Sequence, residues 1–245
     1  MAEKTTYATR EPTWADLSSP DTEASRAFYG ALLGWECTLA QAEFGGYANF
    51  HLDGRVVAGV LPLMTEAQPP SWTVYLATDD SDATHAPVGQ AGGTANAPPM
   101  DVMGLGRMAV YADRTGAVFG TWQAGTHTGA QLVGELGAPV WAELTATTPS
   151  VAADFSGQAF GLGANVLPNY VELTADGGRS VAGVVDPFWG TTGWVPYFGV
   201  DDPAASAEQA VTFGGSVVLP LTSFPGGSCT IVADPHGAVL DLITT

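Results

Sequence analysis

Basic residues are scarce in this 245-residue chain, which has 7 lysines and arginines against 25 acidic residues and a formal charge of −18. A surface of that charge repels phosphate backbones, so we expect no nucleic-acid partner. The chain also lacks an apolar run of the ~20 residues that a membrane-spanning helix needs, and residues 1–12 lack the apolar core of a signal peptide. We therefore expect a cytoplasmic protein without a membrane partner.

Cysteine and histidine are sparse as well, with two and four residues. Cys37 and Cys229 lie in opposite halves of the chain, and in the cytoplasm we expect thiols rather than a disulfide. The histidines show no paired spacing of the kind that metal sites use: His51, His85, His127 and His236. The sequence thus predicts neither a disulfide framework nor a histidine-based metal site.

What the chain does contain is an internal repeat. Segments of the first half return in the same order in the second half, at offsets that drift only from 127 to 121 residues. Such ordered self-similarity indicates two copies of one structural unit. The clearest matches are residues 14–17 with 141–144, 54–60 with 178–184, and 112–118 with 233–239.

Each half also reads as two similar smaller units. A short strand from Trp14 to Ser18 precedes a helix from Thr22 to Leu33, which Asp21 caps and Gly34 ends. Two strands follow, and the pattern then recurs from Trp72 onward. We expect an α+β chain of four βαβββ-like units that form cupped, mixed or antiparallel sheets with pseudo-two-fold symmetry. The predicted division is a first domain over 8–127, a linker over 128–138 and a more divergent second domain over 139–245.

These motifs resemble the vicinal-oxygen-chelate (glyoxalase, bleomycin-resistance and dioxygenase) superfamily. The motifs are Asp21 before a helix with Phe28-Tyr29, then Gly34-Trp35, Gly92-Gly93, and Asp113 three residues before Gly116. The resemblance is strongest to paired-domain, glyoxalase-like proteins of actinobacteria labelled "hydroxylase". It implies two cupped sheets with room for two ligand sites, and it specifies the fold far better than the activity.

In metal-using relatives, histidine or glutamate stands at four positions of each cup. Carried over to this chain, those positions fall on Trp14, Gly59, Thr73 and Gly120, and on Trp141, Gly183, Val195 and Asp241. One carboxylate among eight positions does not supply the three or four ligands of a transition metal. We therefore predict no metal and no cofactor.

The remaining side chains suggest an aromatic-walled pocket for a small molecule. Flat rings offer stacking area to a planar ligand, although the same rings also serve as ordinary core. The predicted binding residues are Trp14, Trp141, Trp72, Tyr75, Trp122, Tyr197 and Arg107. Arg107 becomes Ser228 in the second half, and this asymmetry suggests that at most one of the two clefts is functional.

Three carboxylates are candidates for acid–base chemistry. Asp241 takes a ligand position on the final strand between two leucines, and Asp16 and Glu143 share the face of the strand-opening tryptophans. A carboxylate in an apolar cup has a raised pKa and can move protons. For Asp16 and Glu143, structural hydrogen bonding is the stronger alternative.

Two functions fit this sequence. The favoured one is a metal-independent tailoring enzyme for a bulky aromatic or polyketide-like natural product, catalysing a cyclisation, isomerisation or other proton transfer. The alternative is an antibiotic-binding protein that sequesters its ligand, as bleomycin-resistance relatives do. A metal-dependent dioxygenase or glyoxalase is a distant third, and we expect a monomer or a homodimer.

Overall fold

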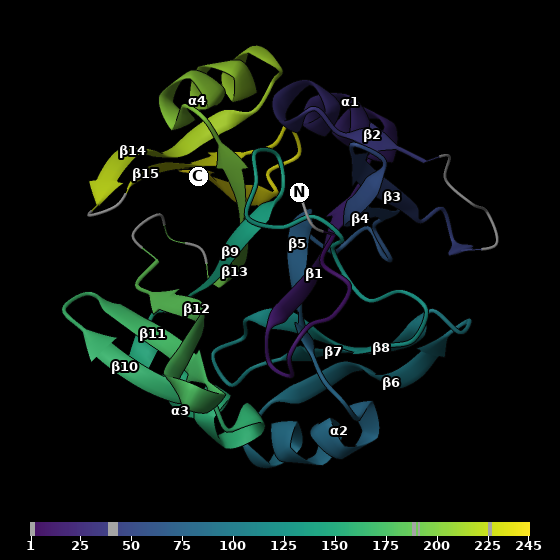
Figure 1. The fold of residues 1–245 in the computed structure, drawn as a ribbon, viewed down its shortest axis with the longest axis vertical. Helices are drawn as coiled ribbons and strands as arrows, with labels where there is room; N and C mark the ends of the chain where they lie inside the picture. Colours follow the sequence, from purple (N-terminus) through teal and green to yellow (C-terminus); the bar gives the residue numbers. More distant parts are fainter. Residues whose placement is uncertain (1–2, 39–43, 188–189, 191, 225–226) are drawn as a thin grey trace.

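The computed structural model describes residues 3–38, 44–187, 190, 192–224 and 227–245, which form two eight-stranded sheets and four α-helices. The strands of the first sheet lie between residues 12 and 124, and those of the second between residues 139 and 244. Each sheet draws on one half of the chain (Figure 1). The predicted α+β fold with two repeated domains is therefore confirmed.

The first sheet has the strand order β2-β3-β4-β1-β5-β8-β7-β6. Its two central strands, β1 and β5, are antiparallel, and each pairs in parallel with the last strand of its own unit, β4 and β8. The strands are β1 (Pro12–Ser19), β2 (Glu36–Cys37), β3 (Ala48–Leu52), β4 (Arg55–Pro62), β5 (Ser71–Ala77), β6 (Thr94–Val102), β7 (Gly106–Ala112) and β8 (Val118–Ala124).

The second sheet repeats this topology in the order β10-β11-β12-β9-β13-β16-β15-β14. Its central strands β9 and β13 are again antiparallel, with parallel partners β12 and β16. The strands are β9 (Pro139–Thr145), β10 (Gly163–Leu167), β11 (Tyr170–Ala175), β12 (Arg179–Val185), β13 (Gly193–Val200), β14 (Ser216–Phe224), β15 (Gly227–Ala233) and β16 (Val239–Thr244). The same order of parallel and antiparallel pairs in both halves confirms the repeat.

Each unit contributes one helix after its first strand: α1 (Thr22–Leu33), α2 (Ser81–Gln90), α3 (Pro149–Phe160) and α4 (Pro203–Thr212), with a single turn η2 at Asp176–Gly178. The sequence explains where α1 begins and ends. The Asp21 carboxylate accepts hydrogen bonds from the first free N–H groups, and Gly34 closes the helix with a φ of 74°. The predicted limits of this helix are confirmed. No helix in the described part of the chain is long and apolar enough to span a membrane.

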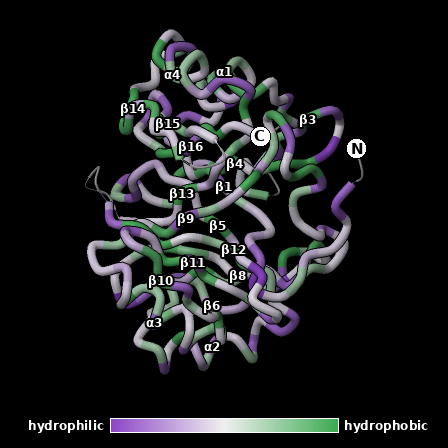
Figure 2. The backbone as a smooth tube through the Cα atoms, turned by 60° about the vertical axis from the view of Figure 1, so that its left-hand side comes forward, coloured by the Kyte–Doolittle hydropathy of each residue, from purple (hydrophilic) through white to green (hydrophobic). Residues whose placement is uncertain are grey.

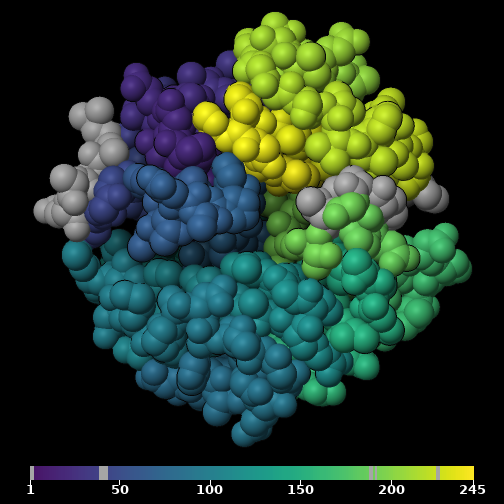
Figure 3. Space-filling view, turned by 180° about the vertical axis from the view of Figure 1, so that it is seen from behind, coloured from purple at the N-terminus to yellow at the C-terminus, as the bar shows by residue number. Residues whose placement is uncertain are grey.

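The helices pack across the boundary between the two domains. Helix α1 of the first domain contacts α4 of the second, and α2 contacts α3. The first unit therefore lies beside the fourth, and the second unit beside the third, as the colours in Figure 3 show. Two buried apolar clusters result, and each contains side chains from both domains. The strands at the centre of the molecule are correspondingly apolar (Figure 2).

Aromatic rings and one buried hydrogen bond join the domains in the first of these clusters. The Phe198 ring of β13 packs against Trp35 and Trp72 of the first domain, with ring centroids 5.0 and 5.5 Å away. The Tyr29 hydroxyl of α1 donates a hydrogen bond of 3.2 Å to Asp234 of the second domain. Because these contacts are fully buried, we expect the two domains to stabilise each other.

Truncation of Phe198 tests this shared core. Phe198→Ala removes a fully buried ring, so the free energy of unfolding should fall by about 3–5 kcal/mol. Denaturant unfolding followed by circular dichroism should show one transition at lower denaturant. The exposed Val166→Ala is the control and should change stability by less than ~0.5 kcal/mol. Two separate transitions, with the first domain unaffected, would contradict a shared core.

Candidate active site on the inner face of the second sheet

The helices cover one face of each sheet, and the opposite face is here called the inner face. Directly opposed residues on paired strands point to the same side, so the register identifies its members. In the second sheet Glu143 is opposite Gly183 and Val195, and Tyr197 is opposite Trp141 and Asp241. The second inner face therefore includes Trp141, Glu143, Tyr170, Glu172, Gly183, Val195, Tyr197, Cys229, Ile231, Asp241 and Ile243.

On the first inner face, three side chains donate hydrogen bonds to the Asp16 carboxylate. The Asp16 carboxylate accepts hydrogen bonds of 2.7 Å from both Trp14 Nε1 and the Tyr47 hydroxyl. Tyr75 also bonds to it, and the Tyr47 hydroxyl fills the space beside Gly59 that a side chain there would need. Burial raises the pKa of Asp16, and these hydrogen bonds partly oppose the shift.

The segment that connects the two domains crosses the first inner face. The His127 ring packs edge-on against Trp14, with ring centroids 4.5 Å apart, and the His127 carbonyl accepts from Trp122 Nε1 at 2.9 Å. Gln131 then hydrogen-bonds to Val56 through both its backbone N–H and its side chain. Trp14 and Trp122 are left only 7 % exposed. Burial lowers the pKa of His127 and so favours its neutral form.

The second inner face has the same tryptophan, carboxylate and tyrosine at equivalent positions. The Tyr197 hydroxyl donates a hydrogen bond to Glu143, and Trp141 Nε1 donates to the Tyr170 hydroxyl at 3.2 Å. Tyr170 also bonds to Glu143, and it fills the space beside Gly183 as Tyr47 does beside Gly59. Burial raises the pKa of Glu143. Trp141, Glu143 and Tyr170 nevertheless remain partly exposed, unlike the tryptophan of the first domain.

Asp241 distinguishes the two faces. Its side chain is fully buried, and neither carboxylate oxygen has a hydrogen-bond partner of good geometry among the described residues. Tyr197 and Cys229 are its polar neighbours, and Glu143 lies close enough to repel its charge. Burial first, and this repulsion second, raise the pKa of Asp241 well above its usual range. Burial and Asp241 together raise the pKa of the Cys229 thiol to about 12.

The equivalent positions of the first domain carry no such group. At an offset of 121 residues, Asp241 corresponds to Gly120, Cys229 to Met108 and Ile243 to Trp122. In the first sheet, the Tyr75 ring occupies the space beside Gly120. Asp241 and Glu143 therefore share one inner face, whereas the other has Asp16 but glycine at the position of Asp241.

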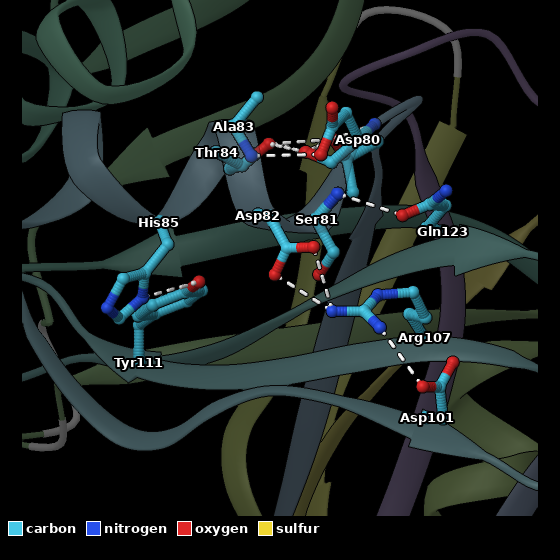
Figure 4. A network of polar contacts seen from close by, with 11 residues as sticks. Asp80, Ser81, Asp82, Ala83, Thr84, His85, Asp101, Arg107, Tyr111 and Gln123 are labelled. Carbon is cyan, nitrogen blue, oxygen red and sulfur yellow. Dashed lines mark hydrogen bonds and ion pairs between the residues drawn. The ribbon is translucent and has the colours of Figure 1, made fainter.

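Two of the predicted binding residues lie away from both inner faces. Trp72 packs on the helix side, where its Nε1 donates to the Tyr29 hydroxyl at 3.1 Å. Arg107, at the start of β7, pairs with Asp82 at 2.8 Å and with Asp101 at 3.1 Å (Figure 4). The structure thus brings Trp141, Glu143, Tyr197 and Asp241 together in the second domain, and Trp14, Asp16, Tyr75 and Trp122 in the first.

Sequence reasoning did not single out Tyr47, Tyr170 or Cys229. Tyr47 and Tyr170 occupy equivalent positions 123 residues apart, each at the start of the last hairpin of its unit. This repetition could have identified the two tyrosines, because the carboxylates Asp16 and Glu143 are repeated as well and each needs a hydrogen-bond donor nearby. Nothing in the sequence marks the connecting segment as the cover of the first inner face.

The donor set of the second inner face does not fit a transition metal. Of the four positions where metal-using relatives carry ligands, Trp141, Gly183 and Val195 offer no charged donor. The space beside Gly183 is filled by the Tyr170 hydroxyl. Among the residues that the structure describes, no three histidine, cysteine or acidic side chains form a group that could hold a metal ion.

A cavity of about 280 Å³ lies elsewhere, between the N-terminal segment and β8. It is lined mainly by small polar side chains such as Thr5, Thr13 and Thr128, and it contains none of the three predicted catalytic carboxylates. Asp79 is its one acidic residue. We therefore assign the chemistry to the second inner face rather than to this cavity.

Comparison with known proteins places the chain in a family. Residues 12–150 match the Glyoxalase/Bleomycin resistance protein/Dioxygenase superfamily, and the chain belongs to that superfamily. It is 37% identical to the anthracycline biosynthesis proteins DauV of Streptomyces sp. (strain C5) and DnrV of Streptomyces peucetius, over 98% of this chain and 94% of each relative. Its fold resembles that of the Mn(II)-bound glyoxalase from Novosphingobium aromaticivorans, with a TM-score of 0.65, 16% identity, and coverage of 97% of this chain and 83% of that one.

Tryptophan truncations test the difference between the two faces. Trp14→Ala removes a ring buried beneath the connecting segment and should lower the free energy of unfolding by about 3–5 kcal/mol. Trp141→Ala removes a partly exposed ring and should cost clearly less. Equal losses in chemical denaturation would show that both faces are equally covered.

The pH dependence of stability tests the state of Asp241. A carboxyl group whose pKa is raised by folding holds its proton in the folded protein after the unfolded chain has lost it. Its contribution to stability therefore declines as the pH rises above about 4, the ordinary pKa of aspartate. The side chain of Asp241→Asn cannot ionise. As the pH rises, the melting temperature of this variant should therefore increase relative to that of the wild type, by a few degrees at pH 8. The exposed Glu208→Gln should show no such trend. A parallel pH profile in Asp241→Asn and wild type would contradict a raised pKa.

Proposed function

We propose that this protein is a tailoring enzyme that catalyses a metal-independent proton transfer on an aromatic, polyketide-like natural product. The observation that carries this proposal is the pairing of two acidic groups on the second inner face. Asp241 is fully buried with Tyr197 and Cys229 as its polar neighbours, and Glu143, which tyrosine hydroxyls hold, lies close enough to repel its charge. Neighbouring carboxyl groups with different surroundings suit the roles of an acid and a base. The names of the relatives DauV and DnrV, which describe them as anthracycline biosynthesis proteins, support the substrate class.

Glu143 is the proposed base. It is partly exposed and thus within reach of a ligand; burial raises its pKa, and hydrogen bonds from Tyr197 and Tyr170 partly oppose that shift. As a base it removes a proton from a carbon next to a ligand carbonyl. The electron pair of the broken C–H bond moves into the ligand and leaves negative charge on the carbonyl oxygen.

Asp241 is the proposed acid. Its raised pKa keeps the proton on the carboxyl group, which can then donate it to a ligand oxygen. Proton transfer from Asp241 to the developing oxyanion gives an enol. Where the enol is conjugated with a further double bond, it takes the proton from Glu143 at the far carbon and returns its own to Asp241, which is an isomerisation. In a cyclisation the enol carbon instead attacks a second carbonyl of the ligand, the enol proton returns to Asp241, and Glu143 gives its proton to the new alkoxide.

The partly exposed rings of Trp141 and Tyr170 supply the surface that binds the ligand. Planar rings of this size suit a planar aromatic ligand. The first inner face offers less of such a surface, because Trp14 and Trp122 are each only 7 % exposed. We therefore place the activity in the second domain, and we take the protein to be cytoplasmic and a monomer or homodimer, as expected from the sequence.

Solvent deuterium exchange tests this function directly. The protein is incubated with excess chelator in D₂O and a panel of aromatic polyketide ketones, and deuterium uptake is measured by mass spectrometry. Enzyme-dependent exchange next to a carbonyl is the expected result. Glu143→Gln should slow it by ~10²–10⁴, and the exposed Glu208→Gln should not.

The other outcomes are equally informative. Tight binding without exchange would identify a sequestering protein, because such a protein needs the aromatic walls but no base. Exchange that disappears in chelator and returns with a divalent metal would contradict metal independence. Full exchange in Glu143→Gln would show that the base lies elsewhere.

A further inference from the structure

The N-terminal segment, residues 4–11, forms one wall of the cavity of about 280 Å³ at the ends of β5 and β8. The Arg10 N–H donates to the Ala77 carbonyl at 2.7 Å, and the Ala77 N–H donates to the Glu11 carbonyl at 2.8 Å. Nearer the N-terminus, the Tyr7 hydroxyl donates to the Ala130 carbonyl at 2.6 Å. These hydrogen bonds hold the segment against the first sheet, so the wall of the cavity is fixed.

The lining of this cavity is polar but carries little charge. Five threonines contribute hydroxyl and methyl groups, Gln123 contributes an amide, and Asp79 is the one charged residue. No lysine or arginine is present among the described residues that line it. An anionic ligand would therefore find no counter-charge here, and a wholly apolar ligand would leave the polar groups unbonded. The threonines are Thr5, Thr6, Thr13, Thr78 and Thr128.

The internal repeat shows that the fold does not require these hydroxyl groups. In the second domain the connecting segment replaces the N-terminal segment, since the Gly137 N–H donates to the Gly199 carbonyl at 2.7 Å and the Gly199 N–H to the Ala138 carbonyl at 3.0 Å. Gly137 and Ala138 correspond to Arg10 and Glu11 at an offset of 127 residues. At this offset, and at 122 for the last pair, the cavity threonines correspond to aliphatic residues: Thr5 to Leu132, Thr6 to Val133, Thr13 to Val140 and Thr78 to Val200.

Several donors at the cavity are not used by the described part of the protein. The Gln123 carbonyl oxygen accepts from the Ser81 N–H at 2.9 Å, which fixes the amide with its nitrogen directed away from Ser81 (Figure 4). The Gln123 NH2 group and the hydroxyl groups of three threonines bond to no other described residue, namely in Thr5, Thr6 and Thr128. These groups can therefore bond to a ligand without breaking a hydrogen bond of the fold.

Asp79 supplies an acceptor beside these donors. One of its carboxylate oxygens accepts from the Thr9 hydroxyl at 2.5 Å, and the other has no partner among the described residues. Because Thr9 belongs to the N-terminal segment, this bond holds the carboxylate at the cavity wall. A ligand hydroxyl group both donates and accepts, so it can bond to Asp79 and to Gln123 or a threonine at the same time.

We infer that this cavity binds a small neutral polyol of the size of one monosaccharide ring. Its volume lies just below the ~300 Å³ at which pockets for drug-sized ligands begin, so it admits a single ring rather than a fused polycyclic ligand. Ligand hydroxyl groups bond to Gln123, Asp79 and the threonines, and ligand C–H groups contact the threonine methyl groups and Trp122. This site is separate from the second inner face and does not depend on the activity proposed there.

Titrations of the full-length protein followed by ¹⁵N NMR test this site. The probes are the methyl glycosides of glucose, galactose, mannose and rhamnose, together with myo-inositol, and tetrahydropyran is the matched ring without hydroxyl groups. At least one polyol should bind about tenfold or more tightly than tetrahydropyran, as expected for one or two hydrogen bonds. It should shift the side-chain signals of Gln123 and Trp122, whereas the indole signal of Trp141 on the second inner face should not move.

Threonine substitutions assign the binding to the hydroxyl groups. The double variant Thr6→Val/Thr128→Val removes two hydroxyl groups with little change of shape, and the repeat itself carries valine at the position of Thr6. Polyol affinity should fall about tenfold or more at an unchanged melting temperature. Thr128→Ser keeps the hydroxyl group and should retain affinity within about twofold. Thr94→Val, at the opposite end of the first sheet, is the control and should have no effect.

Three results would overturn this inference. Full affinity in the double variant, or a shift of Trp141 instead of Trp122, would place the polyol elsewhere. Failure of every polyol to bind would show that the cavity is not a polyol site. Tighter binding of glucosamine than of glucose, lost in Asp79→Asn, would identify a site for cations instead. None of these results bears on the proposed function, which the deuterium-exchange assay tests at the second inner face.

Discussion

The apolar faces of the four helices impose the constraint on which the rest of the structure depends. Each helix covers one face of its own sheet and buries its remaining apolar side against a helix of the other domain, α1 against α4 and α2 against α3. The helix-covered faces of both sheets therefore point toward a shared apolar core. The opposite faces, called inner faces above, point away from that core, so each is open to other parts of the chain or to a ligand.

The two inner faces meet this requirement differently. The segment between the domains packs on the first face, whose carboxylate Asp16 has donors from Trp14, Tyr47 and Tyr75. The second face keeps its tryptophan partly exposed and buries Asp241 completely. Because both faces come from the same repeat, the difference between them lies in a few side chains. A glycine on one face corresponds to an aspartate on the other.

The sequence predicted the fold and its repeat well, because ordered matches at a nearly constant offset report topology directly. It also predicted that Asp241 lies on an inner face, because strand position and alternation place it there. Trp72 could not be placed in the same way, since an aromatic residue on a strand faces the core or the ligand with equal ease. The sequence did not show that the connecting segment packs over Trp14, because the path of that segment depends on tertiary contacts such as those between Gln131 and Val56.

A buried carboxyl group without a partner reduces stability, by roughly 1–3 kcal/mol for an unsatisfied polar group. The shared core offsets such a loss, since a single ring such as Phe198 contributes about as much or more. Under the proposed function, a ligand oxygen that accepts a hydrogen bond from Asp241 would offset this cost, so the stability lost at this residue would favour ligand binding. The symmetric position in the first domain carries glycine, and that face is filled by the chain itself.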